Sequence, residues 1–269
     1  MVKPMADLRI FSYLPNPRIW EATIAARLCG VEIEIRGARP AELKDWLWDF
    51  DARPLSEEDR STTPPVAGRV GFKGGTLRKT DAFLAAHPFA TVPAAFSPDG
   101  ATGIFESNSI MRAVARIGGT RSTLYGRDPY EASRIDSFLD ASLVFARDSQ
   151  LYLLGLRDPD FAADIHARAR DAFAIYAAGI DQALQPDRSF LVGEDLSLAD
   201  ICFVAELCLF LNERHHRATL DRRGLTPILD EHWRETFPRA SAHFDRLINH
   251  PAFAPDVRPY LQKLYARAA

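Results

Sequence analysis

The strongest structural signal in the chain is a pair of segments, Thr91-Val92-Pro93-Ala94-Ala95-Phe96 and Phe105-Glu106-Ser107-Asn108-Ser109-Ile110. Between them lies Ser97-Pro98-Asp99-Gly100, where Asp-Gly tolerates positive φ and proline fixes φ near about −65°. Short apolar runs flank this turn, from Val92 to Phe96 and from Gly103 to Phe105. The pattern predicts a β-hairpin. A proline at the start of its first strand removes a ladder donor, which suits a sheet edge or a special turn.

A helix is predicted directly after the hairpin. Glu106, Ser107 and Asn108 stand where it begins, and its apolar face is formed by Ile110, Met111, Val114 and Ile117. A helix N-terminus offers unpaired N–H groups and a partial positive charge, so it favours a bound carboxylate. Ser107 adds a hydroxyl donor, and Glu106 adds an acceptor for an ammonium group. These residues therefore predict a receptor for the α-amino acid end of a ligand.

This combination resembles the thioredoxin-fold half of the cytosolic glutathione transferases. In that family the proline is cis, the backbone of the residue before it pairs with the cysteinyl part of glutathione, and a Glu-Ser pair holds the γ-glutamyl end. The resemblance assigns the first role to Val92 with Pro93 and the second to Glu106 with Ser107. It implies glutathione as the cofactor, an α/β thioredoxin-like domain followed by an all-α domain, and a homodimer.

The composition is that of an ordinary globular protein, with 47% hydrophobic and 26% charged residues. The net charge of −3 gives no electrostatic case for nucleic acid or an anionic membrane. No run has the length of a transmembrane helix, and Met1 to Asp7 does not resemble a signal peptide. Cys29, Cys202 and Cys208 lack the spacing of a redox pair or zinc site. We therefore expect reduced thiols, a cytoplasmic protein and no metal.

A β-α-β unit is predicted ahead of the hairpin. Leu8 to Tyr13 is a predicted strand, Pro15-Asn16-Pro17 a turn, and Trp20 to Cys29 a helix closed by Gly30. Residues 31–36 alternate apolar and charged side chains, which predicts a second strand. This order agrees with a thioredoxin-type fold and with right-handed crossovers.

We expect the thioredoxin-like domain to cover residues 6–118 and to carry an insertion at about 39–75. Ala41 to Phe50 has enough apolar residues for one short helix, the stretch up to Gly75 is rich in turn-forming residues and charge, and Leu77 to Leu84 predicts the next helix. Long loops in compact domains are usually functional or disordered. Because the insertion contains several aromatic residues, we expect an ordered excursion near the ligand site.

An all-helical domain is predicted from about residue 128 to residue 260. Apolar residues recur at helical spacing from Ala132 to Phe145 and within Asp164 to Leu184. Ser197 and Asp200 form a capping-box pattern ahead of the apolar run Ile201 to Leu211. The family carries such a segment in its helical domain, so the implied role of Asp200 is structural and not catalytic.

Glutathione chemistry needs a donor that stabilises the thiolate and lowers the pKa of the thiol. In the family this donor follows the first strand, so the candidates here are Asn16, Tyr13 and Ser12. Asn16 lies where a serine-type donor is expected, and Tyr13 lies nearer the position of a tyrosine-type donor. Asn16 is equally interpretable as a turn residue between two prolines.

Thr91 stands where many family members carry a Lys or Gln beside the glycine carboxylate of glutathione. Arg78, Lys79 or Lys73 could supply the missing positive charge, although each is also typical of a solvated surface.

Three functions fit these patterns. The first is a glutathione S-transferase-like enzyme that conjugates glutathione to, or transfers it from, a small electrophilic and moderately apolar substrate. The second is a non-catalytic interaction domain, because the Asn16-Pro17-Arg18 turn and the Phe105 to Ile110 segment also resemble the transferase-like domain of the elongation factor 1 gamma subunit. The third is a glutathione-dependent ether-cleaving or dehalogenating enzyme that uses the insertion as a lid.

Overall fold

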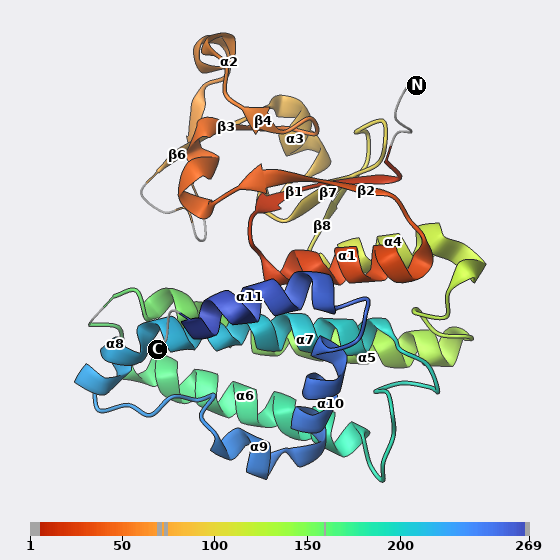
Figure 1. The fold of residues 1–269 in the computed structure, drawn as a ribbon. Helices are drawn as coiled ribbons and strands as arrows, with labels where there is room; N and C mark the ends of the chain where they lie inside the picture. The colour runs from red at the N-terminus through yellow and green to blue at the C-terminus, as the bar shows by residue number, and fades with distance from the viewer. Residues whose placement is uncertain (1–5, 69–71, 73–74, 159, 267–269) are drawn as a thin grey trace. The chain divides into compact units, whose positions relative to one another are not determined.

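The computed structural model describes residues 6–68, 72, 75–158 and 160–266 (Figure 1). The chain divides into two compact units between Arg121 and Ser122. The first unit combines strands and helices, and the second is helical. This confirms the predicted order of an α/β fold followed by an all-α fold.

The first unit is built on a four-stranded sheet in the order β2-β1-β7-β8. β1 is parallel to β2 and antiparallel to β7, and β7 is antiparallel to β8. The strands are β1 (Leu8–Tyr13), β2 (Ile33–Ala38), β7 (Ala94–Phe96) and β8 (Gly103–Phe105). The predicted hairpin and the predicted first strand are thus confirmed.

Two helices cover one face of this sheet, α1 (Pro17–Cys29) and α4 (Ser107–Gly118), the latter followed by the short 3₁₀ turn η2 (Gly119–Arg121) (Figure 1). Gly30 ends α1 in the left-handed conformation, with φ of 63° and ψ of 42°, as predicted. Only glycine adopts this conformation without steric cost, so the residue type fixes the end of the helix.

Residues 39–86 contain the predicted insertion (39–75) and continue past it; this whole segment is called the insertion below. It forms a second four-stranded sheet in the order β4-β3-β6-β5, which the sequence analysis did not predict. Where one helix was expected over Ala41 to Phe50, a 3₁₀ helix leads into a strand. Where a helix was expected from Leu77, a strand precedes it and the helix begins at Asp81. The elements are η1 (Pro40–Asp45), β3 (Trp46–Trp48), β4 (Arg53–Pro54), α2 (Glu57–Thr62), β5 (Pro65–Ala67), β6 (Thr76–Lys79) and α3 (Asp81–Ala86).

The second sheet and α3 cover the face of the first sheet that lies opposite α1 and α4 (Figure 1). Phe11 and Phe96 point to this side and join Trp48, Leu77 and Phe83 in one buried cluster. The rings of Phe11 and Trp48 meet edge to face with their centroids 5.4 Å apart, a favoured aromatic geometry. The described residues of the insertion therefore form an ordered layer, because they bury large side chains against the sheet.

The second unit consists of helices and short turns around the apolar helix α7. Its elements are α5 (Pro129–Gly155), α6 (Ala163–Ala183), α7 (Leu198–Phe210), η3 (Leu211–His216), α8 (Arg217–Arg222), α9 (His232–Thr236), α10 (Pro238–Ile248) and α11 (Ala254–Ala266). The Ser197–Asp200 capping box at the start of α7 is present, as predicted. In the described residues no helix has both the length and the apolar character needed to cross a membrane.

Candidate functional site

Three segments that carry predicted site residues meet on the side of the first sheet where β1 and β8 end and β7 begins. This side is called the edge below. Phe11 of β1 lies opposite Ala94 of β7, and Ala94 lies opposite Phe105 of β8. The residues after Phe11, before Ala94 and after Phe105 therefore all leave the ladder at the same edge. Because neighbouring strands lie roughly 4.8 Å apart, the two outer segments are about 10 Å apart across this edge.

Val92 presents an unused strand edge at the centre of this arrangement. The Val92–Pro93 peptide bond is cis, as the resemblance implies. Val92 is half-buried, and β7 begins only at Ala94. Within the described part of the chain, neither the N–H nor the C=O of Val92 has a hydrogen-bond partner. A backbone donor and acceptor in this state pair readily with an extended peptide.

Glu106 and Ser107 lie at the junction of β8 and α4. Glu106 is the N-cap of α4, has a φ of 67° and makes no side-chain capping bond. Its carboxylate is exposed, and no described residue forms a hydrogen bond or ion pair with it. Ser107 is 8% exposed and occupies the first helical position. An open carboxylate thus stands beside the positive end of a helix.

Ser12 and Asn16 form a buried polar pair. Asn16 is 1% exposed and Ser12 is fully buried. Asn16 Oδ1 accepts the N–H of Arg18 at 3.1 Å, which caps α1. Asn16 Nδ2 donates to Ser12 Oγ, also at 3.1 Å. One amide hydrogen of Asn16 and the hydroxyl hydrogen of Ser12 are left for any further acceptor.

Tyr13 and Thr91 complete the predicted set. Tyr13 is the last residue of β1, is half-buried and packs against the aromatic cluster beneath the insertion. Thr91 directly precedes Val92, and its Oγ1 lies 3.5 Å from His87 Nε2. The structure thus brings Ser12, Tyr13 and Asn16 to one end of the sheet edge and Glu106 with Ser107 to the other, with Val92 between them.

The three basic residues considered for the glycine carboxylate of glutathione, Arg78, Lys79 and Lys73, differ in their surroundings. The Arg78 guanidinium donates to the carbonyl of Thr63. Lys79 is only 5% exposed and its Nζ donates to the carbonyl of Ala90 at 2.6 Å. Lys73 lies outside the described residues. Sequence reasoning treated Lys79 as a solvated charge, and no local signal reveals its burial.

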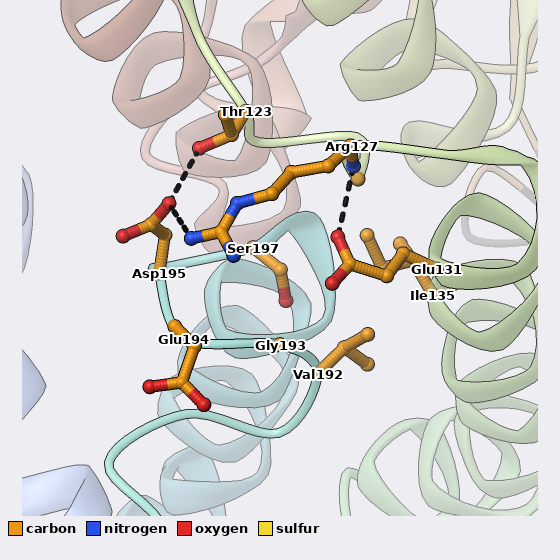
Figure 2. A pocket seen from close by; sticks show the side chains of 10 residues that line it. Thr123, Arg127, Glu131, Ile135, Val192, Gly193, Glu194, Asp195 and Ser197 are labelled. Carbon is orange, nitrogen blue, oxygen red and sulfur yellow. Dashed lines mark hydrogen bonds and ion pairs between the residues drawn. The ribbon is translucent and has the colours of Figure 1, made fainter.

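A small pocket in the second unit is lined by polar residues that bond to one another and connect two segments of the chain (Figure 2). Asp195 Oδ2 accepts hydrogen bonds from Thr123 Oγ1 at 3.1 Å and Arg127 Nη2 at 2.6 Å. Glu131 Oε2 accepts the N–H of Arg127 at 2.8 Å. The pocket holds about 10 Å³, roughly the space of one water molecule. These contacts join the segment before α5 to the turn before α7.

The chain is similar in sequence to elongation factor 1-gamma proteins. It is 28% identical over 191 residues to probable elongation factor 1-gamma 1 of Arabidopsis thaliana, covering 68% of this chain and 40% of that protein. It is 26% identical over 253 residues to elongation factor 1-gamma of Homo sapiens, covering 93% of this chain and 46% of that protein. The chain thus spans less than half the length of these relatives. No family model matches it.

Solved structures of similar fold include glutathione S-transferases. One from Methylobacillus flagellatus, with GSH bound, superposes with a TM-score of 0.65 at 14% identity, covering 93% of this chain and 98% of that one. Another from Methylobacterium radiotolerans, in complex with glutathione sulfonate, gives a TM-score of 0.61 at 18% identity, covering 93% and 94%. At these identities the likeness concerns the fold.

Proposed function

For a chain that has the glutathione S-transferase fold, we propose that the sheet edge around Val92 binds glutathione and that the protein transfers glutathione to or from a small electrophile. The observation that carries the proposal is the alignment, along one edge, of an unpaired Val92 backbone with the open Glu106–Ser107 helix start. The edge spans about 10 Å, which matches roughly three extended residues. A tripeptide therefore has the right length to follow it.

The cysteinyl and γ-glutamyl parts of glutathione each have a partner of suitable chemistry along this edge. The N–H and C=O of Val92 pair with the cysteinyl backbone. The carboxylate of Glu106 accepts from the α-ammonium of the γ-glutamyl group, and Ser107 with the α4 N-terminus donates to its α-carboxylate. The cysteinyl thiol then lies toward the end of β1, where a donor from Tyr13, Asn16 or Ser12 stabilises the thiolate.

Calorimetric titration with reduced glutathione tests the binding step. Glu106→Gln removes the negative charge but keeps the shape of the side chain. A hydrogen bond to a charged group is worth about 1.5–3 kcal/mol, so affinity should fall roughly 10- to 150-fold. Glu57→Gln, at an exposed position of α2, is the matched control and should bind like the wild type. Equal affinity in the wild type and Glu106→Gln would rule out this site.

Two substitutions separate the donor role of Asn16 from its capping role. Asn16→Asp keeps an oxygen that can accept from Arg18 N–H but removes the amide donor, so the helix cap survives. Tyr13→Phe removes the phenol. Turnover of an activated aryl halide should fall at least tenfold in whichever variant lacks the thiolate donor, while glutathione affinity changes little. If both variants retain full turnover, neither residue is the donor.

The burial of Asn16 and Ser12, together with the sequence likeness to elongation factor 1-gamma, favours a second candidate function. This is a glutathione transferase-like interaction domain without turnover. It predicts that the wild type shows no activity above buffer with electrophiles of several classes, whether or not glutathione binds. Measurable turnover that depends on Tyr13 or Asn16 would exclude it.

The proposal also includes a cytoplasmic location and a homodimer. The described cysteines are all buried free thiols, which suits a reducing compartment. Light scattering of the purified chain measures the assembly, and a mass near 30.0 kDa would contradict the dimer.

A further inference from the structure

The insertion places a buried lysine beneath the loop that carries Val92. Lys79 is the last residue of β6 and is 5% exposed. Its Nζ donates to the main-chain carbonyl of Ala90 at 2.6 Å and lies 4.5 Å from the centre of the Trp48 ring. The contact with Trp48 is a cation–π interaction. β6 belongs to the second sheet, so the side chain of Lys79 connects the second sheet to the loop before β7 of the first sheet.

The loop from His87 to Pro93 is held in an unusual backbone conformation. Ala90 has a φ of 52°, which residues with a Cβ rarely adopt. The N–H of Ala90 donates to the carbonyl of His87 at 2.9 Å. The His87 ring is fully buried and stacks on Phe105, the residue before Glu106, with centroids 4.9 Å apart. The hydrogen bond from Lys79 to the Ala90 carbonyl therefore holds the loop at a point two residues before Val92.

Lys79 makes one contact here that an apolar side chain of similar length could not make. Burying an ammonium group is costly, and an apolar side chain of similar length would fill the same space beside Trp48 at lower cost. What an apolar side chain lacks is a donor for the Ala90 carbonyl. Fixing that carbonyl restricts the peptide planes that follow it, and so the direction of the unpaired Val92 N–H and C=O.

We propose that Lys79 is a positioning residue, through which the insertion sets the geometry of the Val92 edge for a bound glutathione backbone. The inference rests on the proposed function, since it requires that this edge binds glutathione. It differs from the direct role considered for a basic residue, in which the ammonium group pairs with the glycine carboxylate. The burial of Lys79 and its bond to Ala90 favour the indirect role.

A comparison of two ligands separates the indirect role from the direct one. Glutathione and γ-glutamylcysteine share the parts that meet Val92 and Glu106, but only glutathione carries the glycine carboxylate. A positioning role predicts that Lys79→Met weakens both ligands by the same factor, up to about tenfold, because the energy of the Lys79–Ala90 hydrogen bond is the most that the lost order of the loop can cost. Direct pairing predicts a loss for glutathione alone, and that result would overturn the inference.

The matched control is Lys44→Met, at an exposed position of η1 in the same insertion. It should leave both affinities unchanged. Hydrogen exchange of the Ala90 amide in the ligand-free protein provides a readout that does not need binding. It should become faster in Lys79→Met and stay the same in Lys44→Met, because only the first substitution releases the loop.

The outcomes distinguish this inference from the proposed function. If the wild type binds neither ligand, the proposed function fails and the positioning role for that ligand fails with it, whatever the Ala90 exchange shows. If the wild type binds and Lys79→Met binds equally well, the inference alone is wrong. Should Lys79→Met not fold, Lys79→Gln tests the same contact, because its shorter, neutral side chain stays polar but offers no charged donor to the Ala90 carbonyl. It should weaken both ligands equally, and unchanged affinity would again overturn the inference.

Discussion

Replacing Asp200 with alanine should destabilise the helical unit more than a typical substitution. Asp200 is fully buried and accepts hydrogen bonds from Leu191 N at 3.0 Å, and from Ser197 N, Ser197 Oγ and His243 Nε2 at 2.8 Å each. Arg246 donates to His243 Nδ1 at 2.7 Å. Because a guanidinium can only donate, Nδ1 accepts, and the proton on Nε2 points at Asp200.

The cost follows from the donors that lose their acceptor. A buried donor without a partner costs about 1–3 kcal/mol, so four of them set a lower bound near 4 kcal/mol. Asp200→Asn keeps Oδ1 for Leu191 and His243 but turns an NH₂ toward the N–H of Ser197, while the Ser197 hydroxyl can rotate to accept. That variant should lose about 2 kcal/mol.

Urea unfolding followed by far-ultraviolet circular dichroism measures both losses. In a thermal melt the alanine variant should lose roughly 10 °C, at about 2–4 °C per kcal/mol for a unit of this size. Asp187→Ala is the control, because Asp187 is exposed and forms no hydrogen bond or ion pair within the described residues. The reasoning would be refuted if Asp200→Ala stayed within about 1 kcal/mol of the wild type while folding normally.

Further predictions concern the two units separately. A Cβ on Gly103 would lie 2.2 Å from the Ala86 carbonyl oxygen, so Gly103→Ala should lower the free energy of unfolding by about 1–3 kcal/mol or more. Gly179 in α6 has open space around it, so Gly179→Ala should instead raise the free energy of unfolding by about 0.5–1 kcal/mol. Urea unfolding measures both changes. Burial lowers the pKa of His87, and the nearby Lys79 ammonium lowers it further. Below about pH 6.5 the unfolded state therefore binds a proton at His87 that the folded state does not bind, and the folded state loses stability. The urea midpoint of unfolding should fall as the pH is lowered from 7.5 to 5.5, and it should fall less steeply in His87→Phe. Equal pH profiles of the two proteins would contradict this. Burial also raises the pKa of the Cys208 thiol, so a disulfide reagent should modify it quickly in urea and very slowly in the native protein.

Local signals in the sequence were sufficient for much of the first sheet and for α7. The Asp99-Gly100 turn, the left-handed Gly30 and the Ser197–Asp200 capping box each depend on a few adjacent residues, and the structure contains all three. Such elements can be predicted because a backbone conformation or a cap is specified by the residue types themselves.

The insertion could not be predicted in the same way. Its strands are two to four residues long, too short for a periodic pattern. β3 gains its partner from β6, so that Leu47 lies opposite Arg78. Pairing across such a separation is decided by tertiary packing, here of Trp48 against Phe11 and Phe83.

The candidate site likewise contains a part that the sequence could predict and a part that it could not. Glu106 and Ser107 were identified from adjacent residues and Val92 through the family resemblance, and the strand register brings them to one edge. The two hydrogen bonds of Asn16 and the burial of Lys79 depend on what the folded chain places around them. A residue type alone does not distinguish a helix cap from a thiolate donor, or a buried lysine from a solvated one.

The outer strands of the second sheet also determine how easily another strand could pair with that sheet through its backbone. The two edges of that sheet are β4 and β5, and each contains a proline, Pro54 and Pro65. A proline offers no N–H to an incoming strand, and exposed strand edges are templates for aggregation unless they are blocked. The insertion therefore adds a sheet to the fold while limiting the open ladder that another chain could extend.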